Sequence, residues 1–275
     1  MKLSAQPPSL RRANAISVDS AALPLWLYPL LFLTGLAAGF VDSITGGGGL
    51  ITIPVLLNVG MPPQFALGAN KLQATFGSGS AVWHYGRAGL INFSACKLGI
   101  LCTLIGATGG TLLVSRLPPN LLKQTIPWLL IAIALYFIFQ PKLGAVDRTP
   151  RLNATWFHLI FGLGIGFYDG FFGPGTGTFW AMAYLLCLGF NLTRATAHTK
   201  VMNFTSNIAS LAVFLIAGHC HYGAGFCMGL GQLLGARLGS KAVIRSGAKF
   251  IRPVFIAVVL AITARLLWQN FSGGR

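Results

Sequence analysis

Residues 39–49 read GFVDSITGGGG, and residues 166–177, which begin 127 positions further on, read GFYDGFFGPGTG. Four glycines in succession do not hold a stable helix interior, because each costs about 1 kcal/mol relative to alanine. We therefore expect the chain to unwind at residues 46–49 and again at residues 173–177. Apolar segments flank both stretches, so each break interrupts a hydrophobic run.

The composition identifies the chain as a polytopic membrane protein. Hydrophobic residues make up 54% of the 275 residues, charged residues make up 9%, and the mean hydropathy is +0.70. Soluble domains carry about 25% charged residues, so this chain has too few charges to cover a water-facing surface. Unwound backbone is tolerated in a bilayer only where protein or a water-filled cavity satisfies its N–H and C=O groups. We therefore expect both breaks to face an internal cavity.

The excess of basic residues does not indicate a nucleic-acid partner. Twenty Lys and Arg residues against four Asp and Glu residues give a net charge of +16, but the basic residues lie in short connectors between apolar runs, as the positive-inside rule describes. The 35 glycines show no Gly-X-Y period, which excludes collagen, and the five cysteines form no CxxC pair, so no disulfide framework or zinc site is indicated. The expected partners are membrane lipid and a small solute, and the chain could form a homo-oligomer.

Eight apolar runs approach the length needed to cross about 30 Å of hydrocarbon as helices. They lie near residues 25–40, 66–83, 97–115, 124–140, 153–168, 195–217, 222–237 and 253–268. Two further apolar runs, 47–59 and 178–189, are too short to cross alone, and each follows a break. We expect each of these to be a re-entrant half-helix within an all-α membrane protein.

The sequence also repeats itself. Besides the two GFxD motifs, four residues of the first half match four residues of the second half at an offset of 129; the pairs are Gly60 with Gly189, Ala66 with Ala195, Lys71 with Lys200, and Ser80 with Ala209. We therefore divide the chain into four parts, namely a polar N-terminal segment (1–22), a first transmembrane repeat (23–141), a basic cytoplasmic connector (142–152) and a second transmembrane repeat (153–270).

Charge counting favours repeats of inverted topology. If each broken segment folds back as a hairpin, five apolar pieces per repeat invert the second repeat, and twelve basic residues then fall on the inside; the inside connectors are 84–97, 141–152, 190–200 and 237–252. If each broken segment crosses once, the five basic residues of the last connector fall outside, which the positive-inside rule disfavours. The inverted arrangement places both termini outside, although Lys2, Arg11 and Arg12 oppose that placement.

Two of the four acidic residues, Asp42 and Asp169, lie at matching positions inside apolar segments. A charged side chain at the bilayer centre costs at least about 2.5 kcal/mol on insertion scales, so such residues are functional candidates. One interpretation gives both a role in proton coupling or gating. The other is that each caps the half-helix that begins after the glycines, since Asp is a favoured N-cap residue. His198 is a third candidate for proton coupling, because an imidazole titrates near neutral pH.

The breaks also predict an anion site. A helix N-terminus presents unpaired N–H groups and about half a positive charge, and broken helices that meet at mid-membrane usually hold the substrate in secondary transporters. The alternative is that the breaks are hinges or close-packing positions, and that the two lysines extend to the membrane interface. The candidate substrate-binding residues are Gly46, Gly47, Gly48, Gly49, Asn70, Lys71, Gln73, Gly173, Gly175, Thr176, Thr199, Lys200, Asn203 and Asn207.

Further glycines favour close helix packing rather than chemistry. Gly106 and Gly110, and likewise Gly231 and Gly235, follow the small-xxx-small pattern of tightly packed membrane helices. The run His219-Cys220-His221 lacks a third ligand in its short connector, so no metal or other cofactor is expected.

The stretch GFVDSITGGGGLITIPVLLNVGMPPQFALGANKLQA, together with GFYDGFFGPGTGTF and ATAHTKVMNFTSN, resembles the sulfite exporter TauE/SafE family of membrane transporters, and looks closest to its bacterial YfcA-type members. The resemblance covers nearly the whole chain from about residue 25. It implies a bacterial inner-membrane permease for sulfite, sulfoacetate or related organosulfur anions. The two-half motif of the family falls here on Asp42, Gly46 to Gly49, Asn70 and Lys71, and then on Asp169, Gly173, Gly175, Lys200 and Asn203. The second break reads GPGTG, so the two halves of the site are not equivalent.

Three functions compete at this level. The first is a secondary transporter that moves a small sulfur oxyanion, outward and coupled to protons. The second is an anion or proton channel, or a membrane subunit that does not itself transport. The third is an intramembrane aspartyl protease, whose GxGD signature is absent from the first motif, GFVD. No GxxxxGK[ST] loop is present, so an ion or substrate gradient would supply the energy.

Overall fold

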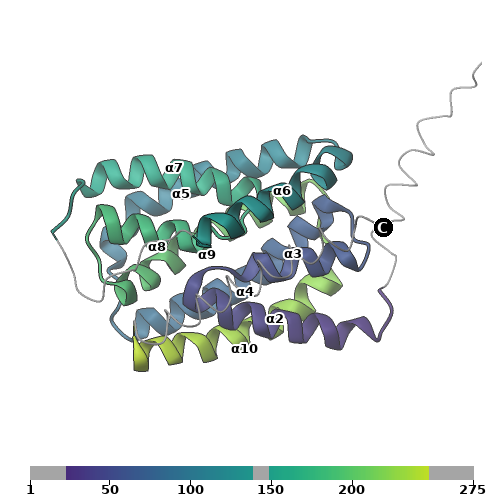
Figure 1. The fold of residues 1–275 in the computed structure, drawn as a ribbon, viewed down its shortest axis with the longest axis horizontal. Helices are drawn as coiled ribbons and strands as arrows, with labels where there is room; N and C mark the ends of the chain where they lie inside the picture. Colours follow the sequence, from purple (N-terminus) through teal and green to yellow (C-terminus); the bar gives the residue numbers. More distant parts are fainter. Residues whose placement is uncertain (1–22, 139–148, 248–275) are drawn as a thin grey trace, which may run out of the picture.

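The computed structural model describes residues 23–138 and 149–247. Within these ranges the chain forms nine α-helices and no strand (Figure 1). The helices are α2 (Leu27–Thr45), α3 (Gly48–Asn58), α4 (Pro63–Arg87), α5 (Phe93–Arg116), α6 (Pro119–Ile138), α7 (Ala154–Phe171), α8 (Thr176–Cys187), α9 (Leu192–Ile216) and α10 (Tyr222–Ser246). The expected polar segment 1–22, most of the connector 142–152 and the expected span 253–268 lie outside the described residues.

Helix starts follow local capping chemistry. The side chains of Asn92, Asn153, Asn191 and His221 each accept a hydrogen bond from a backbone N–H in the first turn of the helix that follows, as N-cap residues do. Each apolar run expected within the described residues is a helix, which confirms the all-helical prediction. Three of the described helices contain a span apolar and long enough to cross a membrane, namely Leu27–Ile44, Phe93–Arg116 and Leu192–Ile216.

Several of the expected boundaries were wrong, and two of them bear on the site and on the charge count. The helix α10 continues to Ser246, so Arg237, Lys241 and Arg245 belong to a helix rather than to a connector. These three residues are exposed and four positions apart, so they lie on one face of α10 while Gly239 and Val243 are buried on another. The first break is also narrower than residues 46–49, because α3 already begins at Gly48.

Each break uses backbone conformations that favour glycine. Gly46, which ends α2, has a φ of 80°, and Gly173 and Gly175, before α8, have φ values of 95° and 81°. L-residues with a side chain rarely adopt positive φ. The chain therefore leaves the helical path at both breaks because of these glycines.

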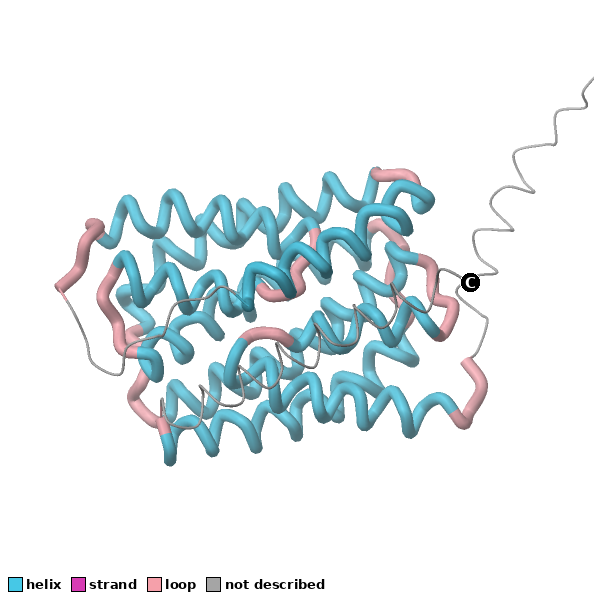
Figure 2. Tube along the Cα trace, in the orientation of Figure 1, coloured by secondary structure: helices cyan, strands magenta, loops and turns pink. Residues whose placement is uncertain are grey.

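Contacts link the two ends of each broken segment. The backbone N–H groups of Arg151 and Leu152, just before α7, donate to the carbonyl of Cys187 at the end of α8, at 2.8 and 3.1 Å. In the other half, Leu31 near the start of α2 packs in one cluster with Leu56 near the end of α3. The two breaks lie near the middle of the long axis, away from the turns at either end of the bundle (Figure 2).

The two halves of the chain exchange helices. Among the described helices, the most extensive contacts join α10 to α2 and α5 to α7, and Figure 1 shows these pairs along opposite edges with α4 and α9 between them. A Cβ atom on Gly231 or Gly235 would overlap the backbone of α2, and one on Gly106 or Gly110 would overlap the backbone of α7. The close-packing interpretation of these glycines is therefore confirmed.

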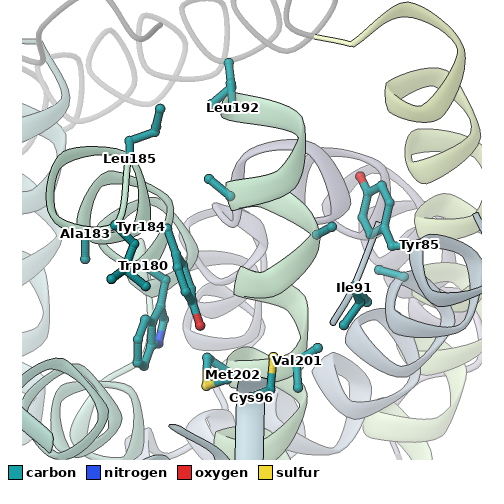
Figure 3. Close-up of a cluster of buried hydrophobic side chains, with 14 of the residues drawn as sticks. Tyr85, Ile91, Cys96, Trp180, Ala183, Tyr184, Leu185, Leu192, Val201 and Met202 are labelled. Atoms are coloured by element: carbon teal, nitrogen blue, oxygen red, sulfur yellow. The ribbon is translucent and has the colours of Figure 1, made fainter. Parts of the chain in front are cut away.

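The aromatic core lies beside the second half-helix. Trp180 and Tyr184 of α8 stack with ring centroids 5.7 Å apart, and Phe157 of α7 packs 4.9 Å from the Tyr184 ring. Figure 3 shows both α8 rings next to Met202 of α9. This cluster fixes α8 against α9, the helix that carries Lys200.

Candidate central binding site

The two breaks meet. A Cβ atom on Gly46 would overlap the Cα atom of Gly177 in the first turn of α8, and one on Gly49 would lie 3.3 Å from the Cα atom of Pro174. Glycine at residue 46 is therefore required twice, once for its positive φ and once for this close approach between backbones. As a result, the first turns of α3 and α8 lie next to each other at the centre of the bundle.

A cavity of about 30 Å³ lies between the breaks. Ten of the residues proposed from the sequence line it, namely Asp42, Gly46, Gly49, Asn70, Lys71, Asp169, Gly173, Thr176, Asn203 and Asn207. Three lining residues were not proposed from the sequence, namely Ala74, Gly177 and Gln232. The remaining candidates Gly47, Gly48, Gln73, Gly175, Thr199, Lys200 and His198 are not among the lining residues.

Two ion pairs cross between the halves of the chain. The Nζ atom of Lys71 lies 2.6 Å from Oδ1 of Asp169 and also donates to the Asp169 carbonyl. The Nζ atom of Lys200 lies 3.3 Å from Oδ2 of Asp42 and also donates to the Asp42 carbonyl. Each repeat therefore supplies the lysine of one pair and the aspartate of the other.

The interpretation of the lysines as interfacial residues was wrong. Lys71 is 1% exposed and Lys200 is 0% exposed, and each lies about two turns inside its helix. A side chain that reaches the interface keeps its ammonium in water, whereas each of these ammonium groups contacts an aspartate carboxylate and a backbone carbonyl inside the protein. Such partners are what a buried charge requires.

The two ion pairs differ in their surroundings. The Asp169 side chain is 5% exposed and also accepts a hydrogen bond from Ser206 of α9. The Asp42 side chain is 15% exposed, and its Oδ1 atom accepts the backbone N–H of Gly48 at 3.3 Å. Asp42 therefore both accepts a hydrogen bond from the start of the first half-helix and pairs with a lysine.

Amide side chains complete the wall of the cavity. The Asn70 Oδ1 atom accepts hydrogen bonds from Thr52 at 2.6 Å and from Gln73 at 3.0 Å, so Gln73 orients Asn70 from behind. Asn207 donates to Ser78 at 3.3 Å. The Asn203 Oδ1 atom is buried and has no hydrogen-bond partner among the described residues. Buried polar atoms are normally paired, so this atom is available to a ligand or to water.

A larger hollow lies at one end of the molecule. It measures about 480 Å³ and is lined by the turn between α4 and α5 and the turn between α8 and α9, including Arg194 and His198. The His198 Nδ1 atom lies 2.9 Å from the Arg194 carbonyl, and its Nε2 atom accepts the Asn92 N–H at 3.3 Å. Both ring nitrogens of His198 are therefore in use, Nδ1 within α9 and Nε2 in holding α9 to the turn between α4 and α5. We place the candidate site at the smaller central cavity, because the half-helix starts and the buried charges converge there.

No described residues form a metal centre, because no three His, Cys, Asp or Glu side chains within residues 23–138 and 149–247 lie close enough to share an ion.

Gln232, which lines the cavity, carried only a weak signal in the sequence. It is a single amide next to Gly231 in a glycine-rich apolar helix, and a polar residue in such a helix is more often explained by contacts between helices.

The family model described as "Sulfite exporter TauE/SafE" matches residues 31–266. The chain belongs to this family. TauE/SafE proteins are membrane transporters, so the chain is a multi-pass membrane transporter and not an enzyme, and the protease hypothesis is set aside. The geometry of the site also argues against a protease, because the two aspartates each pair with a different lysine.

Alignments to curated relatives cover most of the chain. The chain is 47% identical over 244 residues to the probable membrane transporter protein YfcA of Escherichia coli (strain K12), an alignment that covers 89% of this chain and 91% of the relative. It is 46% identical over 244 residues to a probable membrane transporter protein of Haemophilus influenzae, covering 89% and 96%. It is 24% identical over 243 residues to the probable membrane transporter protein YdhB of Bacillus subtilis, covering 84% and 97%. No solved structure matches the chain.

Proposed function

We propose that this TauE/SafE protein is a secondary transporter of the bacterial inner membrane that carries a small anion, with sulfite or an organosulfur oxyanion as the substrate class, and that couples its movement to protons. The observation that carries the proposal is the convergence of two half-helix starts and the buried Lys71 on one central cavity, which is also lined by Asp42, the partner of the buried Lys200. Helix N-termini attract anions through their unpaired N–H groups and dipoles. Broken helices at mid-membrane commonly form the substrate site of secondary transporters.

We further propose that the two repeats are inverted and that α3 and α8 are re-entrant. Two observations support this topology. The segment before α7 is hydrogen-bonded to the end of α8, so the second broken segment returns to the end where it began. The large hollow joins the end of α4 to the start of α9, so these two lysine-bearing helices run in opposite directions.

The distribution of basic residues supports a cytoplasmic location for that end. Arg87 at the end of α4, Arg151 before α7 and Arg194 in the first turn of α9 all belong to this end of the bundle. Arg116 and Lys123 belong to the opposite end, where α5 turns into α6. The larger number of basic residues then lies on the cytoplasmic side, as the positive-inside rule requires.

The crossed ion pairs support the proposal of proton coupling. Both lysines are already neutralised by carboxylates, so an incoming anion competes with an aspartate for the same ammonium group. Protonation of that aspartate removes the competitor and leaves the lysine positive, so a proton and an anion bind together. Asp42 is the better candidate for this step, because its side chain is more exposed and its ion pair is longer than that of Asp169. His198 lies at the larger hollow, so any part it takes in gating would be at the cytoplasmic mouth.

The test is anion flux into liposomes that contain the purified protein. We expect saturable uptake of sulfite or a short sulfonate above that of empty liposomes, and acceleration when the side that holds the anion is made more acidic. An ohmic anion current without saturation would favour a channel instead. No flux for any of sulfite, thiosulfate, sulfonates and carboxylates would contradict the proposed function.

A pair of glycine variants tests the meeting of the breaks. Gly46 and Gly60 both have positive φ, 80° and 85°, but only a Cβ atom on Gly46 would collide with the other half. Positive φ costs a residue with a side chain roughly 1–2 kcal/mol, so Gly60→Ala should keep most of the flux. Gly46→Ala must also separate the two half-helices, and we expect it to reduce the flux at least tenfold. Equal flux in the two variants would show that the contact between the breaks is not needed.

A further inference from the structure

The side chain of Gln232 passes between two helices to reach the central cavity. It leaves α10 and is 2% exposed. A Cβ atom on Gly39 of α2, or on Gly77 of α4, would lie 2.7 Å from the Cγ atom of Gln232. Real Cβ atoms do not approach other carbons so closely. Gly77 is therefore needed to give the Gln232 stem its path, and Gly39 is needed both for the stem and for the close approach of the Gln232 backbone, whose carbonyl oxygen a Cβ atom on Gly39 would overlap.

The amide oxygen at the end of this path has no hydrogen-bond partner in the part of the chain that the structure describes. Gln232 lines the cavity, and its buried Oε1 atom has no hydrogen-bond partner among the described residues. The same is true of Oδ1 of Asn203, which lines the cavity from α9. A buried polar atom without a partner destabilises a fold. An apolar group in place of the amide head would fill the same space without this destabilisation. An unpaired amide oxygen at this position therefore points to a partner that enters the cavity.

The other half of the molecule has no equivalent side chain. Gly231 and Gly235 align with Gly106 and Gly110 at an offset of 125, and the same offset aligns Gln232 with Ala107. Ala107 is fully buried against Gly170 of α7 and does not line the cavity. The cavity therefore receives a polar side chain from α10 but none from the matching position of α5. This asymmetry fits a ligand that is bound off the axis between the repeats.

We propose that Gln232 is a substrate-binding and selectivity residue, whose amide N–H donates a hydrogen bond to an oxygen of a small oxyanion held between the half-helix starts. This inference rests on the proposed function and adds a binding group from α10 to it. An amide head presents either its nitrogen or its oxygen after a half-turn about its last bond, so the Gln232 head, whose Oε1 atom is unpaired, can turn its N–H groups toward an anion.

The test is the variant Gln232→Met, which keeps the length and the unbranched stem but removes the amide. The KM for the transported anion should rise at least about tenfold, because a hydrogen bond to a charged ligand is lost. The thermal unfolding midpoint of the empty protein should stay the same or rise, because an unsatisfied buried group is removed. A merely structural role for Gln232 would not raise KM while leaving the fold as stable as before.

Gln64→Met is the matched control. Gln64 is also a buried glutamine, but it donates to the Leu117 carbonyl at 3.0 Å and does not line the cavity. The same substitution there should lower the unfolding midpoint and leave KM unchanged. Gly77→Ala is a second, independent variant, since its methyl group displaces the Gln232 stem. It should raise KM in the same direction, and it should add little when combined with Gln232→Met.

The outcomes separate this inference from the proposed function. If the wild-type protein neither binds nor transports any small oxyanion, the proposed function fails. If the wild type transports an anion and Gln232→Met does so with unchanged KM, Gln232 is not a ligand and this inference is overturned. A rise in KM in Gln64→Met as large as that in Gln232→Met would overturn it as well, because the effect would then come from the substitution and not from the site.

Discussion

At the scale of single residues, the centre of the protein depends on two lysines and two aspartates whose pairing is reciprocal but unequal. The Lys71 and Asp169 side chains are 2% and 5% exposed and lie 2.6 Å apart, whereas Asp42 is 15% exposed and 3.3 Å from Lys200. A charge left alone in a buried site is strongly destabilising, while a partly solvated partner is easier to replace. The two pairs should therefore respond differently to the loss of their carboxylates.

We expect Asp169→Asn to lower the free energy of unfolding by about 3–5 kcal/mol, because it leaves the Lys71 ammonium buried with only carbonyl partners. Asp42→Asn should lower it less, because the Asp42 carboxylate is nearer to solvent. Unfolding in a titration with sodium dodecyl sulfate measures both values. The double variant Lys71→Met with Asp169→Asn should recover most of the loss, and a larger effect of Asp42→Asn than of Asp169→Asn would contradict this ranking.

At the scale of helices, backbone contacts at glycines hold the outer pairs together. A Cβ atom on Gly235 would overlap the Leu36 carbonyl of α2, and one on Gly110 would overlap the Phe167 carbonyl of α7. Small residues permit such close approach in membrane helices, where packing rather than water exclusion drives association. The spacing of glycines along α5 and α10 thus fixes which helix each of them contacts.

Gly235→Ala should separate α10 from α2 and destabilise the protein by about 1–3 kcal/mol, as expected for overpacking. Gly164→Ala is the matched control on α7, because Gly164 is exposed and a Cβ atom there meets nothing within 4 Å. That change should be neutral, or should stabilise the helix by up to about 1 kcal/mol. Comparison of the two unfolding curves decides the point, and a Gly235→Ala protein as stable as the wild type would refute the packing argument.

Many of the helices, the breaks and the candidate residues could be predicted from sequence, because each depends on a short stretch of the chain. The breaks follow from runs of glycine, the helices from apolar runs, and the candidate residues from the repeat of GFxD and of Lys71 with Lys200. The partners of those residues could not be predicted, because a repeat suggests that each lysine belongs with the aspartate of its own half. The observed pairing joins residues 98 and 158 positions apart. Gln232 was missed for the same reason, since its value depends on Gly39 and Gly77 from two other helices.

At the scale of the whole molecule, neither repeat is a separate body. The first repeat supplies α2 as the partner of α10, and the second repeat supplies α7 as the partner of α5. The ion pairs cross in the same way. Each half on its own would therefore expose a helix face that has lost its partner helix, and would hold charged side chains that have lost their ion-pair partners.

This interlocking predicts the behaviour of a divided chain. Residues 1–143 and 144–275 expressed together should assemble, co-purify and restore anion flux, while either piece alone should aggregate or be degraded. Affinity purification through a tag on one piece, followed by detection of the other, measures the assembly. Stable, folded material from one piece alone would show that the exchanged helices are not required.

The crossed ion pairs also have a consequence for biosynthesis. Asp42 leaves the ribosome 158 residues ahead of Lys200, and Lys71 leaves it 98 residues ahead of Asp169. At translation rates of about 5–20 residues per second, the longer interval lasts roughly 8–30 s. During that time the nascent first half carries a bare carboxylate and a bare ammonium among lipid tails, so the insertion machinery must shelter both until the second half emerges.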